Sequence, residues 1–259
     1  MNPFTSRFGL ATRVMAWRMV RVMIAKPSVI VPSLLMPLFF FTAFAGGLSA
    51  VHNAPGFDYP NYTTFQFMFV ILQSAAFGGV FTGFSIAADF ETGFARRLLL
   101  ANRRRTAIIG GYAVTAMIRL LLTISVVTTV ALIAGADITG SGVDVLGIVT
   151  LAVMLNFAML LFAAGMAMRF RTLQAAPLIQ LPAFLIIMTA PVYVPRELIE
   201  GWVGTAADFN PMTALLEAAR NLVIGAPADF LLAAGVAAGL IAVMINWART
   251  GLRRAEAAG

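Results

Sequence analysis

Six long apolar stretches constrain this chain more than any other feature of its sequence. They lie near residues 28–50, 63–88, 107–134, 144–168, 175–194 and 229–248. An α-helix needs about 20 predominantly apolar residues to cross the hydrocarbon core of a bilayer, so each stretch is long enough for one crossing. We therefore predict an all-α, polytopic membrane protein, in which residues 1–259 form a single transmembrane domain with six spans.

The amino-acid composition narrows the classes of protein further. The 259 residues are 60% hydrophobic and 11% charged, whereas a soluble domain averages roughly 45–50% and about 25%, which excludes an ordinary soluble enzyme and a disordered chain. Cysteine is absent and His52 is the one histidine, so a zinc–thiolate site and a two-histidine metal site are excluded. The one lysine, Lys26, does not lie in the G-x-x-x-x-G-K-[ST] pattern of a P-loop. We expect no ATPase activity and no cofactor on this chain itself.

The basic residues gather in alternate segments between the spans. Fifteen of the 18 lie in four segments: 1–26, 89–106, 169–174 and 249–259. Two lie in the other three segments: 51–62, 135–143 and 195–228. Because arginine and lysine cluster on the cytoplasmic side, we predict that both termini are cytoplasmic and that the net charge of +7 reflects topology rather than a nucleic-acid partner. Abundant arginine, alanine and glycine indicate a GC-rich bacterial genome, so we expect the bacterial cytoplasmic (inner) membrane.

Residues 1–27 precede the first span and carry an amphipathic helical pattern. Apolar and small residues recur at helical spacing: Phe8, Thr12, Met15, Met19 and Val22. The arginines fall on the opposite side: Arg7, Arg18 and Arg21. This pattern, stopped by Pro27, predicts a helix that lies in the membrane surface and contacts lipid.

The cytoplasmic segment 89–106, between the second and third spans, is far longer than a turn needs. It holds acidic residues near its start, a glycine, a short apolar patch and five arginines. We interpret it as a small helix that docks onto a partner, through Glu91, Gly93, Phe94, Arg96 and Arg97. The alternative for the arginines alone is that they anchor the loop on anionic lipid.

Segment 195–228, on the outer side, contains a second helix with clear end signals. Asn210 is a good N-cap and Pro211 fits the first helical position, while Gly225 and then Pro227 form a stop. The helix is too short to cross a bilayer, so we predict an amphipathic or re-entrant helix at the outer interface. On its polar face Glu217 can pair with Arg220 one turn later. It is either a surface lid or a gate for cargo.

Within the predicted spans, a few polar and small residues stand out. Arg119 is costly, by about 2.5–3.5 kcal/mol at the centre of a membrane helix, and is either structural or part of a gate. For Asn156, Gln180 and Gln73, we expect hydrogen bonds between helices. The pairs Gly79–Gly83 and Gly235–Gly239 fit the small-x-x-x-small pattern of closely packed helices.

The order of several motifs resembles the ABC-2-type permease family, the membrane subunits of type-two ABC exporters, and most of all its bacterial drug- and lipid-exporting branch. On the cytoplasmic side these are Glu91-Thr92-Gly93 with Leu98-Leu99, then Arg103 to Arg105 and Gly110-Gly111. On the outer side they are Pro195-Arg196-Glu197 with Gly201-Trp202, Asn210-Pro211-Met212-Thr213, and Glu217-Ala218-Ala219-Arg220 with Gly225. Where the family often has an acid three residues before the arginine of the third span, this chain has Ala116.

This resemblance implies a permease subunit of an ATP-driven exporter. A separate ABC ATPase subunit would bind ATP and Mg, a second permease subunit, identical or homologous, would complete the pathway, and the docking helices would transmit movement to the spans. In related exporters the second and fifth spans border the cargo path. The residues on these spans are Gln73, Phe77, Phe81, Phe84, Phe184 and Met188. They suit a hydrophobic or amphipathic cargo such as a drug or lipid, unless the stripe faces lipid.

Other functions fit the sequence less well. A glycan or other polar cargo remains an alternative within the same family. An ion-coupled secondary transporter usually buries a carboxylate or histidine in a span, and no acid lies in the middle of any span here. An ABC importer would need a cytoplasmic E-A-A-x-x-x-G loop, but Val223 stands at the glycine position and the segment is predicted outside. An intramembrane enzyme would need a nucleophile–base pair or metal cluster, and neither H-E-x-x-H nor G-x-S-x-G occurs.

Overall fold

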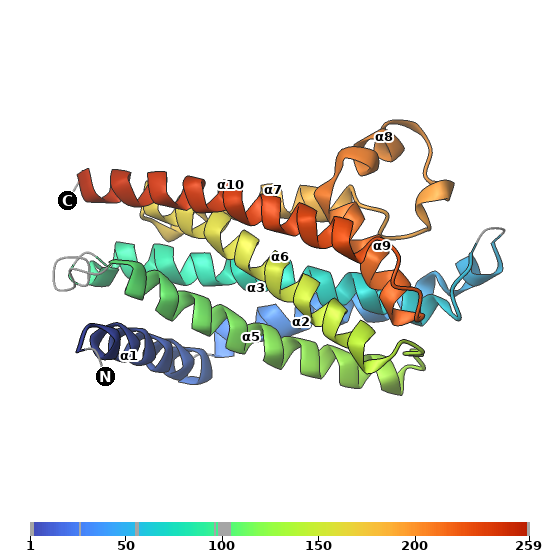
Figure 1. Cartoon of the computed structure of the whole chain (residues 1–259), viewed down its shortest axis with the longest axis horizontal. Helices are drawn as coiled ribbons and strands as arrows, with labels where there is room; N and C mark the ends of the chain where they lie inside the picture. Colours follow the sequence, from blue (N-terminus) through green and yellow to red (C-terminus); the bar gives the residue numbers. More distant parts are fainter. Residues whose placement is uncertain (1–2, 26, 55–56, 96, 98–104, 258–259) are drawn as a thin grey trace.

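Long helices running side by side make up the structure, a computed structural model that describes residues 3–25, 27–54, 57–95, 97 and 105–257 (Figure 1). The α-helices are α1 (Pro3–Ala25), α2 (Pro27–Gly47), α3 (Tyr62–Glu91), α5 (Arg105–Ile133), α6 (Gly142–Phe170), α7 (Ala176–Met188), α8 (Gly201–Phe209), α9 (Pro211–Val223) and α10 (Phe230–Ala257). Short 3-10 helices are η1 (Ser49–Asn53), η2 (Leu173–Ala175) and η3 (Arg196–Leu198). The described residues contain no strand, which confirms the all-α prediction for that part of the chain.

Four of the predicted spans are long apolar helices. By length and composition alone, the stretches able to cross a membrane are Tyr62–Glu91, Ile109–Ile133, Gly142–Phe170 and Phe230–Ala255. Two further apolar helical stretches, Ser33–Gly47 and Leu173–Met188, are shorter. They match the predicted first and fifth spans, so the expected count of six stays a prediction.

The fifth predicted span, 175–194, forms a shorter helix than expected. Its helix α7 ends at Met188, and Pro182 lies inside it. Two prolines follow the end, Pro191 and Pro195. Proline has no backbone N–H and disfavours a helical conformation in the residue before it, which explains why the helix stops early. Carbonyl groups at the end of α7 are therefore free to bind side chains from other helices.

The two ends of the bundle differ in which helices and connecting segments lie there. Figure 1 shows α1, the end of α3, the start of α5 and the end of α10 at one end, which we call the basic end. The other end carries η1, α8 and α9 and is called the opposite end. The segments rich in basic residues thus lie together, as the predicted alternation of loops requires.

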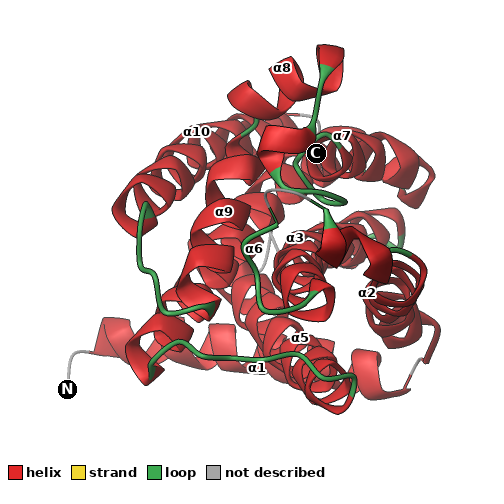
Figure 2. Ribbon diagram, turned by 90° about the vertical axis from the view of Figure 1, so that its right-hand side faces the viewer, coloured by secondary structure: helices red, strands yellow, loops and turns green. Residues whose placement is uncertain are grey.

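Helix α3 lies at the centre of the helical bundle. It is buried along most of its length and packs mainly on α6, α5 and α2; Figure 2 shows α2 and α7 flanking it. Close approach to α6 depends on glycine, because a Cβ on Gly79 would lie 2.5 Å from the backbone oxygen of Asn156. The side chain of Asn156 donates from Nδ2 to the carbonyl of Ala75 at 2.8 Å, which confirms its predicted bond between helices. Gly235 and Gly239, by contrast, face open space.

Candidate functional site

The predicted docking segment begins with a left-handed turn at the basic end. Helix α3 ends at Glu91, and Gly93 has a φ of 72°, a conformation that glycine adopts without steric cost. The amide of Gly93 donates to the carbonyl of Phe90 at 3.0 Å. The chain is helical again at Phe94, Ala95 and Arg97, within the segment that was predicted to form a small docking helix. Arg96 and residues 98–104 lie outside the described residues.

Asp89, in the last turn of α3, binds two other helices. Arg18 of α1 donates from Nη1 to Asp89 Oδ2 at 2.9 Å and from Nη2 to Oδ1 at 2.7 Å. The hydroxyl of Tyr112 on α5 donates to Oδ2 at 2.6 Å. Asp89 is 7% exposed, and a buried carboxylate needs such compensation. These three residues, which we call the Asp89 cluster, join α1, α3 and α5.

The contacts of the Asp89 cluster show that the predicted orientation of Arg18 on α1 is wrong. Met15 and Met19 are buried, as the helical pattern predicts. Arg18 was expected on the opposite, polar face, and this is wrong, because its guanidinium turns inward to the carboxylate of Asp89. The hydrogen bonds to Asp89 raise the pKa of Arg18. Neither Asp89 nor Tyr112 was predicted to bind Arg18, since the three residues lie far apart in the chain.

The docking segment also contacts the α6–α7 connection. The Oε2 atom of Glu91 accepts the backbone N–H of Leu173 at 3.0 Å, at the start of η2, where such donors lack partners within the helix. Arg97 is exposed and its Nε donates to the carbonyl of Gly93 at 3.4 Å. The structure thus brings Glu91, Gly93, Phe94 and Arg97 together on one short segment, while their contact with an ATPase stays a prediction.

At the opposite end, Arg220 on α9 is buried rather than surface-exposed. It is 1% exposed and donates from Nη1 to the carbonyl of Pro191 at 2.7 Å. Its guanidinium lies 3.4 Å from the centre of the Phe65 ring. The predicted pair with Glu217 is therefore wrong: Glu217 is half-buried and its carboxylate lies 3.8 Å from Arg196 Nη1. The reason is that α9 packs against α3, α6 and α10, so its supposed polar face meets protein.

The predicted ends of α9 are confirmed. The Oδ1 atom of Asn210 accepts the N–H of Met212 at 2.9 Å, and Pro211 begins the helix. The Nδ2 group of Asn210 also donates to the carbonyl of Ile186 in α7 at 2.6 Å. Gly225 follows the helix with a φ of 79°. The same residue that caps α9 therefore ties it to α7.

Two of the polar side chains singled out in the predicted spans lack partners among the described residues. Arg119, in the middle of α5, is 1% exposed, and its Nε and Nη1 have no acceptor there. Gln73 on α3 is fully buried with neither amide atom bonded. Gln180 is half-buried on α7. The expected bonds between helices are thus found for Asn156 and absent from the described contacts of Gln73.

The predicted cargo-path residues form a continuous aromatic row on α3. The ring centres of Phe77 and Phe81 lie 5.9 Å apart, and those of Phe81 and Phe84 lie 5.7 Å apart. Phe77 is buried within the chain, whereas Phe81 and Phe84 are half-buried. On α7 the half-buried residues are Phe184 and Met188. Whether this row borders a path between subunits stays a prediction.

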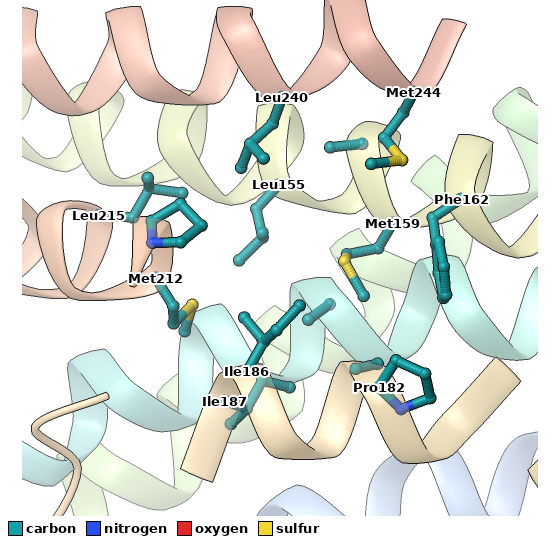
Figure 3. A pocket seen from close by; sticks show the side chains of 14 residues that line it. Leu155, Met159, Phe162, Pro182, Ile186, Ile187, Met212, Leu215, Leu240 and Met244 are labelled. Atoms are coloured by element: carbon teal, nitrogen blue, oxygen red, sulfur yellow. The ribbon is translucent and has the colours of Figure 1, made fainter. Parts of the chain in front are cut away.

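A small apolar cavity lies between α3, α6, α7, α9 and α10 (Figure 3). Its volume is about 140 Å³, and every residue that lines it is apolar. Met159, Pro182, Met212 and Leu240 point toward it from four helices. Pockets for drug-sized ligands are about 300–1,000 Å³, so in this conformation the cavity is too small for such a molecule. None of the predicted path residues lines it.

Comparison with known proteins agrees with the motifs and the helical architecture. The family profile described as "ABC-2 type transporter" matches residues 11–224. The chain is similar to the "Daunorubicin resistance ABC transporter permease protein DrrB1" of Streptomyces coeruleorubidus, with 24% identity over 239 residues. The aligned region covers 90% of this chain and 82% of that protein. The profile match extends over both the docking segment and α9. The chain is therefore a membrane-embedded, multi-pass member of the ABC-2 type transporter family.

Proposed function

We propose that this chain is the permease subunit of an ATP-driven exporter that moves a hydrophobic or amphipathic, drug-like compound outward across a bacterial cytoplasmic membrane. The family match carries this proposal, and the drug-resistance name of the relative favours a drug as cargo. ATP and Mg are bound by a separate ABC ATPase subunit, which contacts the segment from Glu91 to Arg97. Both termini and this segment are cytoplasmic, and α8 and α9 are outside.

Apolar residues on α3 and α7 support the choice of cargo. The half-buried Phe81, Phe84, Phe184 and Met188 offer aromatic faces and a flexible thioether, which accept ligands of varied shape. Arg119 is the one charged residue inside the helical stretch from Ile109 to Ile133. A glycan would require many more hydrogen-bonding side chains along its path.

A second permease subunit, identical or homologous, completes the path. Exposed apolar side chains line one face of α2, at Val31, Leu35 and Phe39. Helix α7 also exposes apolar side chains, at Leu181 and Leu185. These helices flank α3 in Figure 2. Between two such chains, the aromatic row of α3 would lie near the shared surface, with lipid covering the remaining apolar faces.

Inverted membrane vesicles test the transport function. The chain is co-expressed with an ABC ATPase of the same genome that co-purifies with it, and uptake of the fluorescent drug daunorubicin is followed. We expect uptake that depends on ATP, persists with a protonophore, and is lost when the catalytic glutamate of the ATPase is replaced. Uptake abolished by the protonophore but independent of the ATPase would instead indicate an ion-coupled transporter.

Two variants test the path and two fusions test the topology. Replacing Phe77 and Phe81 with alanine should change the drug-stimulated part of the ATPase activity while basal activity and complex assembly persist. An unchanged stimulation curve for every apolar cargo would assign the row to packing or lipid. Reporters fused after Asp58 and after Asp208 should both be located outside, and a cytoplasmic signal at either position would contradict the proposed orientation.

A further inference from the structure

We infer that Arg18 is a positioning residue that braces the docking segment across its glycine turn and thereby couples α1 to ATPase movement. This inference rests on the proposed function, because it takes the segment from Glu91 to Arg97 as the part that the ATPase moves. We assign Arg18 no contact with cargo or nucleotide. Its role is to hold the residues after Gly93 in a fixed position relative to α3, so that a movement of the docking segment also moves α3.

Arg18 contacts residues on both sides of Gly93. Four residues before the glycine, Asp89 accepts two hydrogen bonds from the guanidinium, at 2.9 and 2.7 Å. One residue after the glycine, the Phe94 ring centre lies 3.8 Å from the Arg18 Cζ atom. A single side chain from α1 therefore touches the chain on both sides of the turn.

A brace is needed because the turn by itself is permissive. The left-handed conformation of Gly93 is readily adopted by glycine, and nothing lies within 4 Å of the position where a Cβ would stand. An unrestrained turn would let the following helix rotate without moving α3. Contact between Phe94 and a guanidinium that is fixed to Asp89 opposes this rotation, so a displacement of the segment is transmitted to α3 and α1 together.

The contact of Arg18 with Asp89 is stronger than its contact with the Phe94 ring. The two parallel hydrogen bonds of an arginine with a carboxylate fix direction as well as distance. Tyr112 donates to the same carboxylate at 2.6 Å, which holds Asp89 in place from α5. Lysine in place of Arg18 would keep the charge, but it could neither form the paired bonds nor lie flat over the Phe94 ring.

Replacing Arg18 with glutamine tests the brace in the assembled exporter. We expect Arg18→Gln to preserve membrane insertion, complex assembly and basal ATPase activity, while drug transported per ATP hydrolysed falls about 2- to 30-fold, the range for mutations that alter coupling between sites. Arg18→Lys should fall between the wild type and Arg18→Gln.

A matched control and a second measurement separate coupling from folding. Arg196→Gln removes an arginine–aspartate pair of similar chemistry, with Asp208 at 2.6 Å, from the opposite end of the chain, and should leave the transport ratio unchanged. Because the chain has no cysteine, spin labels at Arg21→Cys and Arg97→Cys report the position of the docking segment relative to α1 without any ATPase. Their distance distribution should broaden in Arg18→Gln.

The two measurements also distinguish failure of the brace from failure of the proposed function. If the wild-type complex does not export drug but the label distances broaden as expected, the proposed function fails and the brace stands as a structural device. If the wild type exports drug and Arg18→Gln matches Arg196→Gln in both transport ratio and label distances, the brace is refuted. If Arg18→Gln does not fold, Arg18→Lys with wild-type ratio and distances refutes it equally.

Discussion

Replacing Arg220 with methionine should loosen the junction between α7 and α9. The guanidinium donates to the carbonyl of Pro191 at 2.7 Å, and a hydrogen bond from a charged donor contributes about 1.5–3 kcal/mol. Its contact with the Phe65 ring, at 3.4 Å, adds about 0.5–2 kcal/mol. Methionine fills a similar volume but leaves the Pro191 oxygen without this donor.

The net loss is smaller than the sum of these contacts. The two contacts together contribute about 2–5 kcal/mol, and the hydration that the methionine variant regains offsets part of this, so the lower end of the range applies. The carbonyl of Val192 keeps a donor, because Gln66 Nε2 lies 2.8 Å from it. We therefore expect Arg220→Met to lower the free energy of unfolding by about 2 kcal/mol, which at about 2–4 °C per kcal/mol for a chain of this size is about 4–8 °C in Tm.

Thermal unfolding in detergent and amide hydrogen exchange measure this effect together. The Tm of Arg220→Lys should lie between the wild type and Arg220→Met, since lysine can still donate to Pro191. Exchange should rise in residues 186–193, at the end of α7. Glu217→Gln is the control, because its pairing with Arg196 is 3.8 Å long and partly exposed and contributes less than about 1 kcal/mol. If Arg220→Met and Glu217→Gln shift the Tm equally, with unchanged exchange, the reasoning is refuted.

Glycine and arginine positions in the spans give further predictions. Gly79→Ala should destabilise the protein strongly, because its Cβ would lie 2.5 Å from the α6 backbone. Gly235 faces open space, so Gly235→Ala should stabilise the protein by up to about 1 kcal/mol. Equal Tm values for the two variants would contradict this expectation. Arg119→Leu should raise the Tm in detergent, because a buried cation whose Nε and Nη1 lack acceptors in the described structure is costly, while drug export falls if Arg119 serves the gate. A lower Tm for Arg119→Leu would instead reveal a stabilising bond.

Features fixed by local chemistry were predictable from the sequence. The ends of α9 follow from an N-cap before proline and from a glycine that adopts a positive φ, and both were identified correctly at Asn210 and Gly225. The left-handed turn at Gly93 follows from the same property. The long apolar helices follow from composition, because each segment satisfies its own backbone within the helix.

Features that depend on tertiary packing were not predictable in this way. Arg220 was placed on a polar face by helical periodicity, but α9 lies between three helices and its arginine reaches carbonyls that the broken end of α7 leaves free. Arg18 was placed on the side of its helix opposite the apolar residues, yet a carboxylate 71 residues away in sequence turns it inward. Periodicity assigns a residue to one side of a helix, but it does not tell what lies on that side.

The structure links the docking segment to the opposite end through a single helix. Helix α3 carries Asp89 and Glu91 in its last turn, and its first turn carries Tyr62, whose hydroxyl donates to the carbonyl of Tyr193 at 2.7 Å. Phe65, one turn later, meets Arg220 of α9. Thirty residues of helix, about 45 Å long, therefore join both ends, and the contacts with α6 at Gly79 prevent the two helices from separating without a void. Helix α3 thus contacts α1 at one end and α7 and α9 at the other, so one helix joins the Asp89 cluster to the junction between α7 and α9.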